Sequence, residues 1–297
     1  MSRIPSLSPD TRLFAVFGHP ISHSLSPAFQ NAGLQAMKVP GAYLAFDVPP
    51  ENLKRSLQTL SDWKAGGVNL TIPLKEVAFD LLDELADSAA FAGSVNTVEF
   101  GENGSMKGHS TDGAGLHLAL EEAFGTAFKD QKVLILGCGG AGRAAALQAA
   151  REGASQVYLA NRTLSKAEAV AGEINQRLPD VETNIFSCWP PKPEEVQEAD
   201  LIIQSTSLGM TAGQEVGFSS DHFREGQGLL DMIYTKEQTP IMKIAATSGV
   251  KAVNGIGMLL HQGVESLRIW TGQEPPVHVM REALIQAVRD RETIRVH

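Results

Sequence analysis

The chain has 297 residues, enough for two hydrophobic cores of ordinary domain size. Its formal net charge of −9 argues against non-specific nucleic-acid binding, which needs clustered lysine and arginine. Two cysteines, Cys138 and Cys188, offer neither a disulfide framework nor metal-ligand spacing, so a reducing, cytoplasmic compartment is expected. The N-terminus lacks an apolar leader and no segment has membrane-spanning length, so we expect no membrane partner.

A short apolar strand is predicted over residues 13–17, followed by a turn rich in glycine, proline and serine. Ser26 stands directly before Pro27, which is typical of the N-cap and first position of a helix. That reading explains Ser26 but not Ser24. Two hydroxyls beside the free N–H groups of a helix could also bind a small carboxylate, and we expect this cradle here.

Apolar and polar residues alternate over 68–72, a period of two that predicts a half-buried strand. Pro73 suits the first position of the following helix, where its missing N–H would have no partner. Lys75 then falls in the first helical turn, where the helix dipole disfavours a cation, and is a candidate general base. The alternative is a solvated surface lysine beside Glu76.

Two polar segments follow, at 94–97 and 108–113. Asp112 in the second segment could cap a helix that begins near Gly113. It could also form an acid–base pair with Lys75, and both readings stay open at this point. His19 and His23 lie close together, but two histidines alone do not make a metal site, so we expect no metal.

A G-x-G-x-x-G pattern spans 137–142, between an apolar strand predicted at 132–136 and a helical pattern at 144–150. In this context the glycines make a tight turn, let a pyrophosphate approach the backbone and let the helix pack on the strand. The segment therefore predicts dinucleotide binding.

The next strand, at 156–160, ends in Asn161-Arg162-Thr163. An enzyme that uses NAD would place an acidic residue here to hold the ribose 2′-hydroxyl, and this chain has none. Arg162 instead offers a planar fork of donors suited to a 2′-phosphate, with Thr163 as a further donor and Lys166 adding positive charge. The alternative, an arginine on a solvated loop, leaves the missing carboxylate unexplained. NADP is therefore expected in preference to NAD.

Further buried strands are predicted at 200–203 and 228–234, so strands alternate with helices through 115–255. This alternation predicts a doubly wound parallel sheet with right-handed crossovers. Two helical patterns close the chain, at 258–269 and 277–288.

Six segments, in this order and spacing, make the chain resemble the shikimate dehydrogenase family from about residue 13 to about residue 270. They are 24–27, 69–75, 96–97, 111–113, 161–163 and 254–262. The resemblance implies reversible, NADP-dependent reduction of 3-dehydroshikimate to shikimate, a step of aromatic amino acid biosynthesis. It also implies an α/β protein in which a Rossmann-type NADP domain (114–255) is inserted into a discontinuous α/β substrate domain (1–113 and 256–297), with the site in the cleft between them.

The family pattern assigns roles to individual residues. Lys75 and Asp112 would be catalytic. The substrate would contact Ser24, Ser26, Asn69, Thr71, Asn96, Tyr234 and Gln262. The cofactor would contact Gly137, Gly139, Gly140, Ala141, Gly142, Asn161, Arg162, Thr163, Lys166, Thr206, Gly255 and Met258.

The chain departs from similar dehydrogenases at two points. Gln204-Ser205 stands where Asn-Ala is usual, and Ser110 stands where Asn is common. Tyr43 occupies a position where some relatives that use both quinate and shikimate carry a tyrosine. Quinate use, or a metabolite-binding regulator without catalysis, are therefore the alternatives, and the oligomeric state stays open between monomer and homodimer.

Overall fold

The computed structural model describes residues 8–211, 214–235 and 237–295. The chain forms two compact units: Met1–Gly115 with Leu259–His297, and Leu116–Met258. It passes from the first unit to the second within helix α5 (Asp112–Phe124) and returns within α10 (Ile256–Thr271). These limits lie close to the predicted domain limits, whereas the roles of the two domains stay predictions.

The first unit contains a six-stranded mixed sheet with the order β2-β1-β3-β5-β6-β4. Its strands are β1 (Arg12–Gly18), β2 (Gly41–Asp47), β3 (Gly67–Leu70), β4 (Glu84–Leu85), β5 (Thr97–Phe100) and β6 (Met106–His109). Strand β1 pairs in parallel with β2 and β3, whereas β5 runs antiparallel to both β3 and β6. The register sets Asn69 of β3 opposite Thr97 of β5, so the polar ends of these two strands meet.

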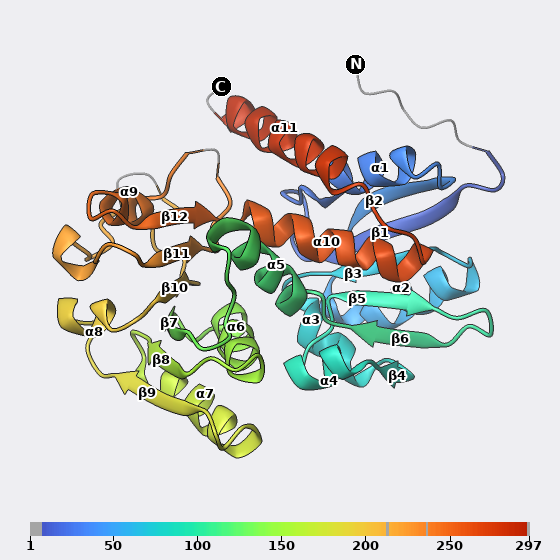
Figure 1. Cartoon of the computed structure of the whole chain (residues 1–297). Helices are drawn as coiled ribbons and strands as arrows, with labels where there is room; N and C mark the ends of the chain where they lie inside the picture. The colour runs from blue at the N-terminus through green and yellow to red at the C-terminus, as the bar shows by residue number, and fades with distance from the viewer. Residues whose placement is uncertain (1–7, 212–213, 236, 296–297) are drawn as a thin grey trace. The chain divides into compact units, whose positions relative to one another are not determined.

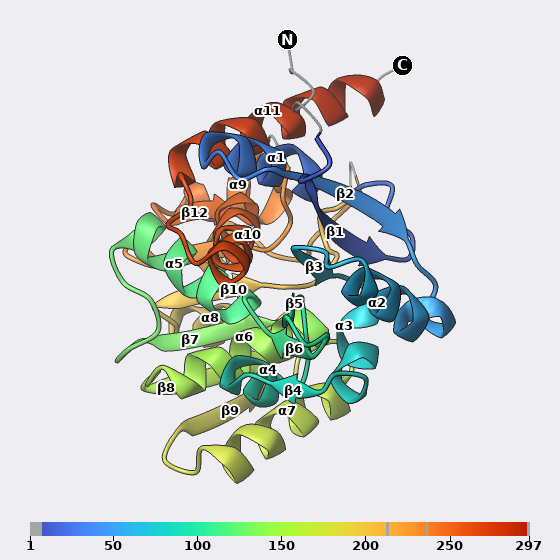
Figure 2. The same ribbon diagram turned by 90° about the vertical axis from the view of Figure 1, so that its right-hand side faces the viewer.

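Helices cover both faces of this sheet (Figures 1 and 2). On one face, α2 (Leu53–Asp62), α3 (Leu74–Val77) and α4 (Asp87–Ala92) bury residues such as Leu57, Leu74 and Ala89 against the strands. On the other face lie α1 (Ser26–Ala36), α10 and α11 (Val277–Arg295), with α11 packed along α1. Short 3-10 turns occur at Pro50–Asn52, Ala78–Asp80 and, in the second unit, Ser220–His222.

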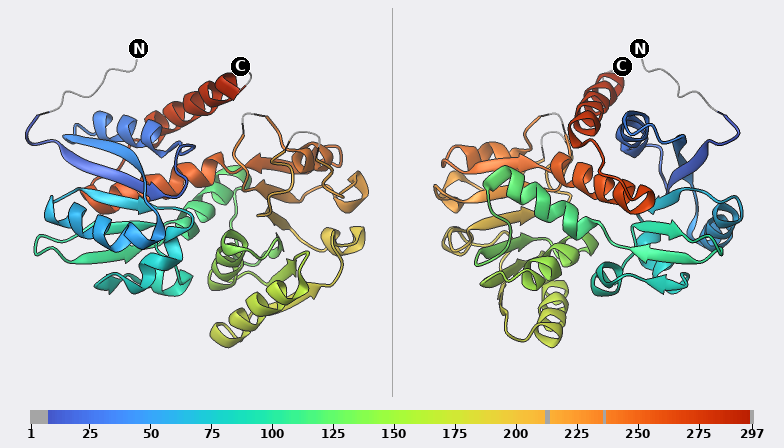
Figure 3. Two further views of the ribbon diagram at one scale, coloured as in Figure 1. Left: turned by 180° about the vertical axis from the view of Figure 1, so that it is seen from behind. Right: turned by 45° about the vertical axis from the view of Figure 1, so that its right-hand side comes forward.

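The second unit contains a six-stranded, fully parallel sheet with the order β12-β11-β10-β7-β8-β9. Its strands are β7 (Lys132–Leu136), β8 (Gln156–Ala160), β9 (Glu182–Phe186), β10 (Leu201–Gln204), β11 (Gly228–Asp231) and β12 (Lys251–Asn254). Helices α6 (Gly140–Arg151) and α7 (Leu164–Arg177) cover one face, and α8 (Pro193–Gln197) and α9 (Pro240–Ala246) cover the other (Figures 1 and 3). The predicted doubly wound α/β architecture is confirmed.

The sequence-based limits of these strands were accurate where a continuous apolar run was bracketed by polar residues. Strands β7 and β8 match the predicted ranges residue for residue. The strand predicted at 228–234 is too long, because the buried carboxylate of Asp231 ends β11. No helix in the described part of the chain is long and apolar enough to cross a membrane.

Candidate functional site

Lys75 and Asp112 form an ion pair in the first unit, with Nζ 2.5 Å from Oδ2. Their side chains are 29% and 18% exposed, so both groups can reach solvent or a ligand while remaining partly desolvated. Lys75 is the second residue of α3, in the first turn as predicted. The prediction that Pro73 is the first helical residue is wrong by one position, because its φ of −95° and ψ of 16° make it the N-cap.

Both carboxylate oxygens of Asp112 are engaged by side chains from other elements. Oδ1 accepts a hydrogen bond from Asn96 Nδ2 at 2.9 Å, and Oδ2 faces Lys75. Helix α5 begins at Asp112 itself rather than at Gly113. Of the two readings left open by the sequence, the acid–base pair is the one that these contacts support.

Asn96 and Gln262 complete this cluster. Asn96 is 2% exposed, and its Nδ2 lies 3.4 Å from Gln262 Oε1, on α10. The close approach of α5 and α10 depends on Gly115, because a Cβ there would lie 2.7 Å from the main-chain nitrogen of Gln262. Residues from four separate parts of the sequence thus converge on one short polar surface.

Asn69 lies behind this surface, with every polar atom of its amide hydrogen-bonded. Its Oδ1 accepts from the Tyr43 hydroxyl at 2.7 Å. Its Nδ2 lies within 3.0 Å of the main-chain oxygen of Asn96 and the hydroxyls of Thr97 and Ser266. The role of Asn69 as a direct substrate contact stays a prediction, but within the protein its amide is already saturated.

Thr71, two residues further along, differs from Asn69 in this respect. Its main-chain groups bond Phe17 and Leu74, and the described residues supply no partner for its hydroxyl. The side chain is only partly buried. Thr71 therefore has the free hydroxyl that a polar ligand would need.

The serine turn differs from its sequence-based reading. Helix α1 begins at Ser26, with Leu25 as its N-cap and no side-chain cap, so the prediction of Ser26 as N-cap is wrong. The Ser24 hydroxyl accepts a hydrogen bond from the Ser26 main-chain N–H at 3.3 Å, which leaves its own proton to donate elsewhere. Both serines are partly exposed, as a carboxylate cradle requires.

Tyr43 links the serine turn to Asn69. Its side chain is fully buried, and burial raises the pKa of the phenol well above its usual range, against the opposing effect of a hydrogen bond from Ser26. The neutral hydroxyl can therefore donate to Asn69. Because Tyr43 is enclosed, it could influence a ligand only through Ser26 or Asn69.

The glycine-rich turn of the second unit joins β7 to α6. Gly137 has φ of +99°, a conformation that favours glycine. At Gly142 a Cβ would lie 1.9 Å from the Gly137 carbonyl oxygen, so only glycine lets the helix pack against the turn. At Gly139 a Cβ would meet nothing, which leaves open space beside the backbone.

Helix α6 starts at Gly140 without a side-chain cap, so the first-turn N–H groups of Gly140, Ala141 and Gly142 lack a capping side chain. Such an N-terminus favours an anion, since the helix dipole and the free N–H groups point at the same place. The geometry of this segment suits a pyrophosphate.

Asn161 ties this turn to the loop after β8. Its Oδ1 accepts from Cys138 N at 2.9 Å, and its Nδ2 donates to Thr163 O at 2.7 Å. Arg162 and Lys166 are exposed, and the described residues supply no ion-pair partner for either side chain. The positively charged side chains of Arg162 and Lys166 are therefore available to bind an anionic group of a nucleotide.

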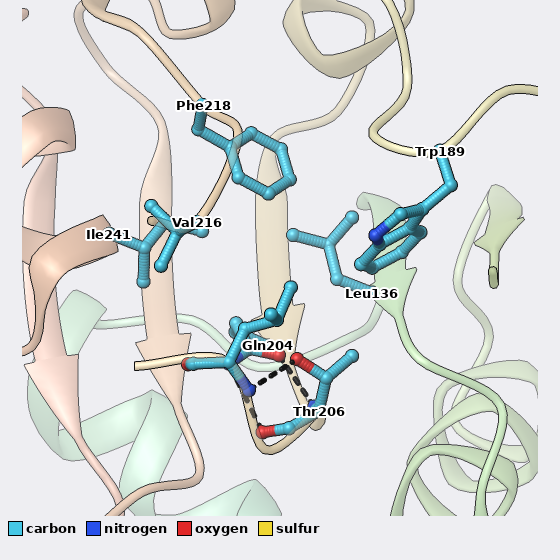
Figure 4. Close-up of a pocket in the computed structure, with 8 residues that line it drawn as sticks. Leu136, Trp189, Gln204, Thr206, Val216, Phe218 and Ile241 are labelled. Atoms are coloured by element: carbon cyan, nitrogen blue, oxygen red, sulfur yellow. Dashed lines mark hydrogen bonds between the residues drawn. The ribbon is translucent and has the colours of Figure 1, made fainter. Parts of the chain in front are cut away.

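Gln204 at the end of β10 is 2% exposed and organises the loop that follows it (Figure 4). Its Nε2 donates to Thr206 O and Leu208 O, both at 3.2 Å, and its Oε1 accepts from Thr206 N. The neighbouring Ser205 hydroxyl reaches Leu136 O and Gly137 O. Gln204 and Ser205, the two residues that differ from similar dehydrogenases, thus hold the loop carrying Thr206 against the glycine-rich turn.

Gln204 also forms part of a narrow, mainly apolar pocket between the sheet and the segment around 216–218. Its lining residues are Leu136, Trp189, Gln204, Thr206, Leu208, Val216, Phe218 and Ile241. Their side chains converge in Figure 4, and the pocket has no room for a water molecule. It is a packing feature of the core.

The remaining predicted residues of the second unit lie near the carboxyl ends of β11 and β12. Tyr234 is 42% exposed on the segment that follows β11. A Cβ on Gly255 would lie 2.3 Å from Met232 O, so glycine is required there. Met258 is partly buried near the start of α10. Their predicted ligand contacts, including the help of Tyr234 to the serine cradle, stay predictions.

Four residues that contribute to the first-unit cluster carry no role in the sequence-based site: Tyr43 as a hydrogen-bond donor, Thr97, Thr111 and Ser266. Each is at most 2% exposed. Thr97 and Thr111 are direct neighbours of the predicted site residues Asn96 and Asp112, so their positions in the sequence indicated a role. The sequence did not indicate a role for Ser266, because a serine on an amphipathic helix is ordinarily solvated.

Comparison with known proteins gives consistent matches along the chain. Residues 16–98 match the shikimate dehydrogenase substrate binding domain, residues 118–212 match shikimate / quinate 5-dehydrogenase, and residues 255–285 match the shikimate 5′-dehydrogenase C-terminal domain. The chain is 37% identical to a shikimate dehydrogenase (NADP+) from Methanopyrus kandleri, over 97% of this chain and 100% of the relative.

Solved structures agree. Shikimate 5-dehydrogenase from Listeria monocytogenes, in complex with shikimate and NAD, has a TM-score of 0.88 at 32% identity and covers 95% of this chain and 99% of its own. Shikimate 5-dehydrogenase from Thermus thermophilus, in complex with NADP(H) and shikimate, has a TM-score of 0.81 at 35% identity. This match covers 93% of the present chain and 99% of the Thermus thermophilus chain. The similarity therefore spans both units.

Proposed function

This chain belongs to the shikimate dehydrogenase family, and we propose that it catalyses reversible hydride transfer between NADP and C3 of shikimate, giving 3-dehydroshikimate. The resemblance inferred from the sequence is confirmed by the relatives. The observation that carries the proposal is the Lys75–Asp112 pair, at 2.5 Å, with Asn96 and Gln262 beside it. In the same proposal, the first unit binds the substrate and the second binds the cofactor.

Oxidation of an alcohol needs a base for the O–H proton while hydride leaves carbon for the nicotinamide. Lys75 is that base: its amine takes the hydroxyl proton, and the resulting ammonium faces Asp112. In reduction the ammonium returns the proton to the alkoxide oxygen. Because the two groups lie in contact, Asp112 holds Lys75 in place for this transfer.

The substrate is a small ring acid with several hydroxyls. Its carboxylate would rest on Ser24 and Ser26, and its ring hydroxyls would meet Thr71, Asn96 and Gln262 together with the catalytic pair. The free hydroxyl of Thr71 and the partly exposed serines support this orientation. Neutral donors to a carboxylate make charge-assisted hydrogen bonds, so no arginine is needed in the cradle.

The cofactor assignment is NADP, which the relatives from Methanopyrus kandleri and Thermus thermophilus name. Its pyrophosphate would lie at the N-terminus of α6, on Gly139 to Gly142. Its 2′-phosphate would lie between Arg162, Thr163 and Lys166, whose side chains are uncommitted within the described chain. The Listeria monocytogenes structure holds NAD, so the choice between the two cofactors needs measurement.

A reducing, cytoplasmic setting fits two unpaired cysteines, of which Cys138 is buried with its thiol pKa raised by burial to about 11. The only protein partner that we propose is a second copy of the chain, in a homodimer. Size-exclusion chromatography with light scattering distinguishes the monomer from the homodimer.

The test compares kcat/KM for shikimate and quinate with NADP and with NAD. The rate is measured from the absorbance of the reduced nicotinamide. We expect the highest value for shikimate with NADP. A higher value for quinate would reassign the substrate, and oxidation of neither acid with either cofactor would support a non-catalytic binding protein, a reading that the presence of Lys75 and Asp112 argues against.

A further inference from the structure

Thr97 and Ser266 form a buried pair of hydroxyls behind the candidate acid–base pair. Both residues are fully buried, and their oxygens lie 2.8 Å apart although they are 169 positions apart in the sequence. Thr97 begins β5 and Ser266 lies in the middle of α10. Buried hydroxyls cost free energy unless they are hydrogen-bonded, and valine or alanine would fill the same space without that cost.

Each hydroxyl has several partners. Ser266 Oγ donates to the main-chain oxygen of Gln262, one turn earlier in α10, at 2.9 Å. Asn69 Nδ2 donates to both hydroxyl oxygens, at 3.0 and 2.9 Å. Because the Ser266 proton is already used, the Thr97 proton has two acceptors, Ser266 at 2.8 Å and Asn96 Oδ1 at 3.0 Å. The pair thus joins β3, β5 and α10.

The consequence falls on the orientation of the Asn96 amide. Its Oδ1 accepts from Thr111 N at 2.9 Å and from the Thr97 hydroxyl, which are both donors. The NH₂ group must then point the other way, toward Asp112 Oδ1 at 2.9 Å. A flipped amide would set its oxygen against the Asp112 carboxylate and its NH₂ against the Thr111 N–H, two unfavourable contacts.

We propose that Thr97 is a positioning residue that locks the Asn96 amide so that its NH₂ holds Asp112 beside Lys75. This inference rests on the proposed function for its catalytic consequence, but the orientation of the amide does not depend on it. Neither hydroxyl touches the substrate in this account. Ser266 also ties Gln262 to the same cluster, through the main-chain oxygen of that residue.

The test compares Thr97→Val, which removes the hydroxyl at nearly constant volume, with Thr97→Ser, which keeps it. We expect Thr97→Val to lower kcat for shikimate oxidation about tenfold and to displace the pH at half-maximal kcat, while KM for NADP stays within about twofold. Thr97→Ser should restore both kcat and the pH profile. Equal kcat values and superimposed pH profiles for the two variants would overturn the inference.

A second pair of variants separates positioning from general destabilisation. Thr97→Ala, which removes the same hydroxyl with a smaller side chain, should reproduce the kinetic defect, and it carries the test if Thr97→Val does not fold. Ser61→Ala is the matched control, because Ser61 is also buried in the first unit and donates to Gly104 O at 3.0 Å, far from the pair in sequence. It should lower the melting temperature without moving the pH profile. A pH profile moved equally by Ser61→Ala would contradict the inference.

A measurement without substrate keeps this inference distinct from the proposed function. In the wild-type protein and in Thr97→Ser, the side-chain NH₂ resonances of Asn96 should exchange slowly with solvent. In Thr97→Val the exchange should become at least tenfold faster. Unchanged exchange would refute the locked amide even if shikimate is the substrate, whereas accelerated exchange in an enzyme inactive on shikimate would refute only the proposed function.

Discussion

Replacement of Gln204 by methionine should loosen the loop that carries Thr206. Methionine has a similar length, but it removes the donor bonds to Thr206 O and Leu208 O and the acceptor for Thr206 N. Each buried hydrogen bond contributes about 0.5–1.5 kcal/mol, and the stranded main-chain groups pay a desolvation cost. The loss should therefore be about 2–4 kcal/mol in the free energy of unfolding of the second unit.

Because this loop is fastened to the glycine-rich turn through Ser205, the Gln204→Met variant should also raise KM for NADP, by about three- to tenfold. Gln227→Met is a matched control in the same unit. Gln227 is also 2% exposed, donates to Val196 O and Ala199 O, and accepts from Arg224 N. It should lose comparable stability with KM for NADP unchanged.

Urea unfolding and initial-rate kinetics measure the two quantities for both variants. A Gln204→Met variant that lost stability but kept the wild-type KM for NADP would refute the link between this loop and the cofactor. An equal rise in KM for NADP in Gln227→Met would also refute this link, since the effect would then follow from lost stability in general.

Three further predictions concern the cofactor, the cradle and pH. Arg162→Ala should raise KM for NADP about ten- to hundredfold, the value of a charge-assisted contact of about 1.5–3 kcal/mol, and leave any NAD activity nearly unchanged; equal losses with both cofactors would contradict a 2′-phosphate contact. Ser24→Ala should lower kcat/KM for shikimate by a similar factor, and the defect should largely vanish on an analogue without the carboxylate. Burial raises the pKa of Asp231 from 3.8 to about 6, although hydrogen bonds from Thr239 and Ile233 oppose this shift. The folded state therefore binds the Asp231 proton more tightly than the unfolded state does. The resulting stabilisation is complete below pH 3.8 and is lost as the pH rises through 6. The melting temperature of Asp231→Asn relative to wild type should therefore rise between pH 4 and pH 7, by an amount equivalent to about 1–3 kcal/mol in the free energy of unfolding. A difference in melting temperature that does not change with pH would count against this.

The sequence was sufficient for the parts of the molecule that depend on local pattern. Strands β7 and β8 were predicted to the residue, because continuous apolar runs end at Gly137 and Asn161. The doubly wound sheet followed from the alternation of strands and helices. The pairing of Lys75 with Asp112, 37 positions apart, was inferred from their chemistry and their order within a family pattern.

Other features depended on contacts that a sequence does not display. Ser26 looked like an N-cap because it precedes Pro27, yet the helix already includes it and Leu25 is the N-cap. The contacts of the Asn69 amide with Tyr43 and the buried hydroxyls were likewise not visible in the sequence, and its predicted substrate contact stays a prediction. Ser266 could not be recognised at all, since its side-chain partners Asn69 and Thr97 lie more than 150 positions away.

The central claim is that Lys75 transfers the proton in shikimate oxidation, and kcat of Lys75→Ala tests it most directly. We expect kcat to fall by about two to four orders of magnitude, the usual contribution of a positioned acid–base group, with much less effect on shikimate binding measured by calorimetry. A variant that keeps near wild-type kcat would contradict the claim, whatever its affinity for shikimate.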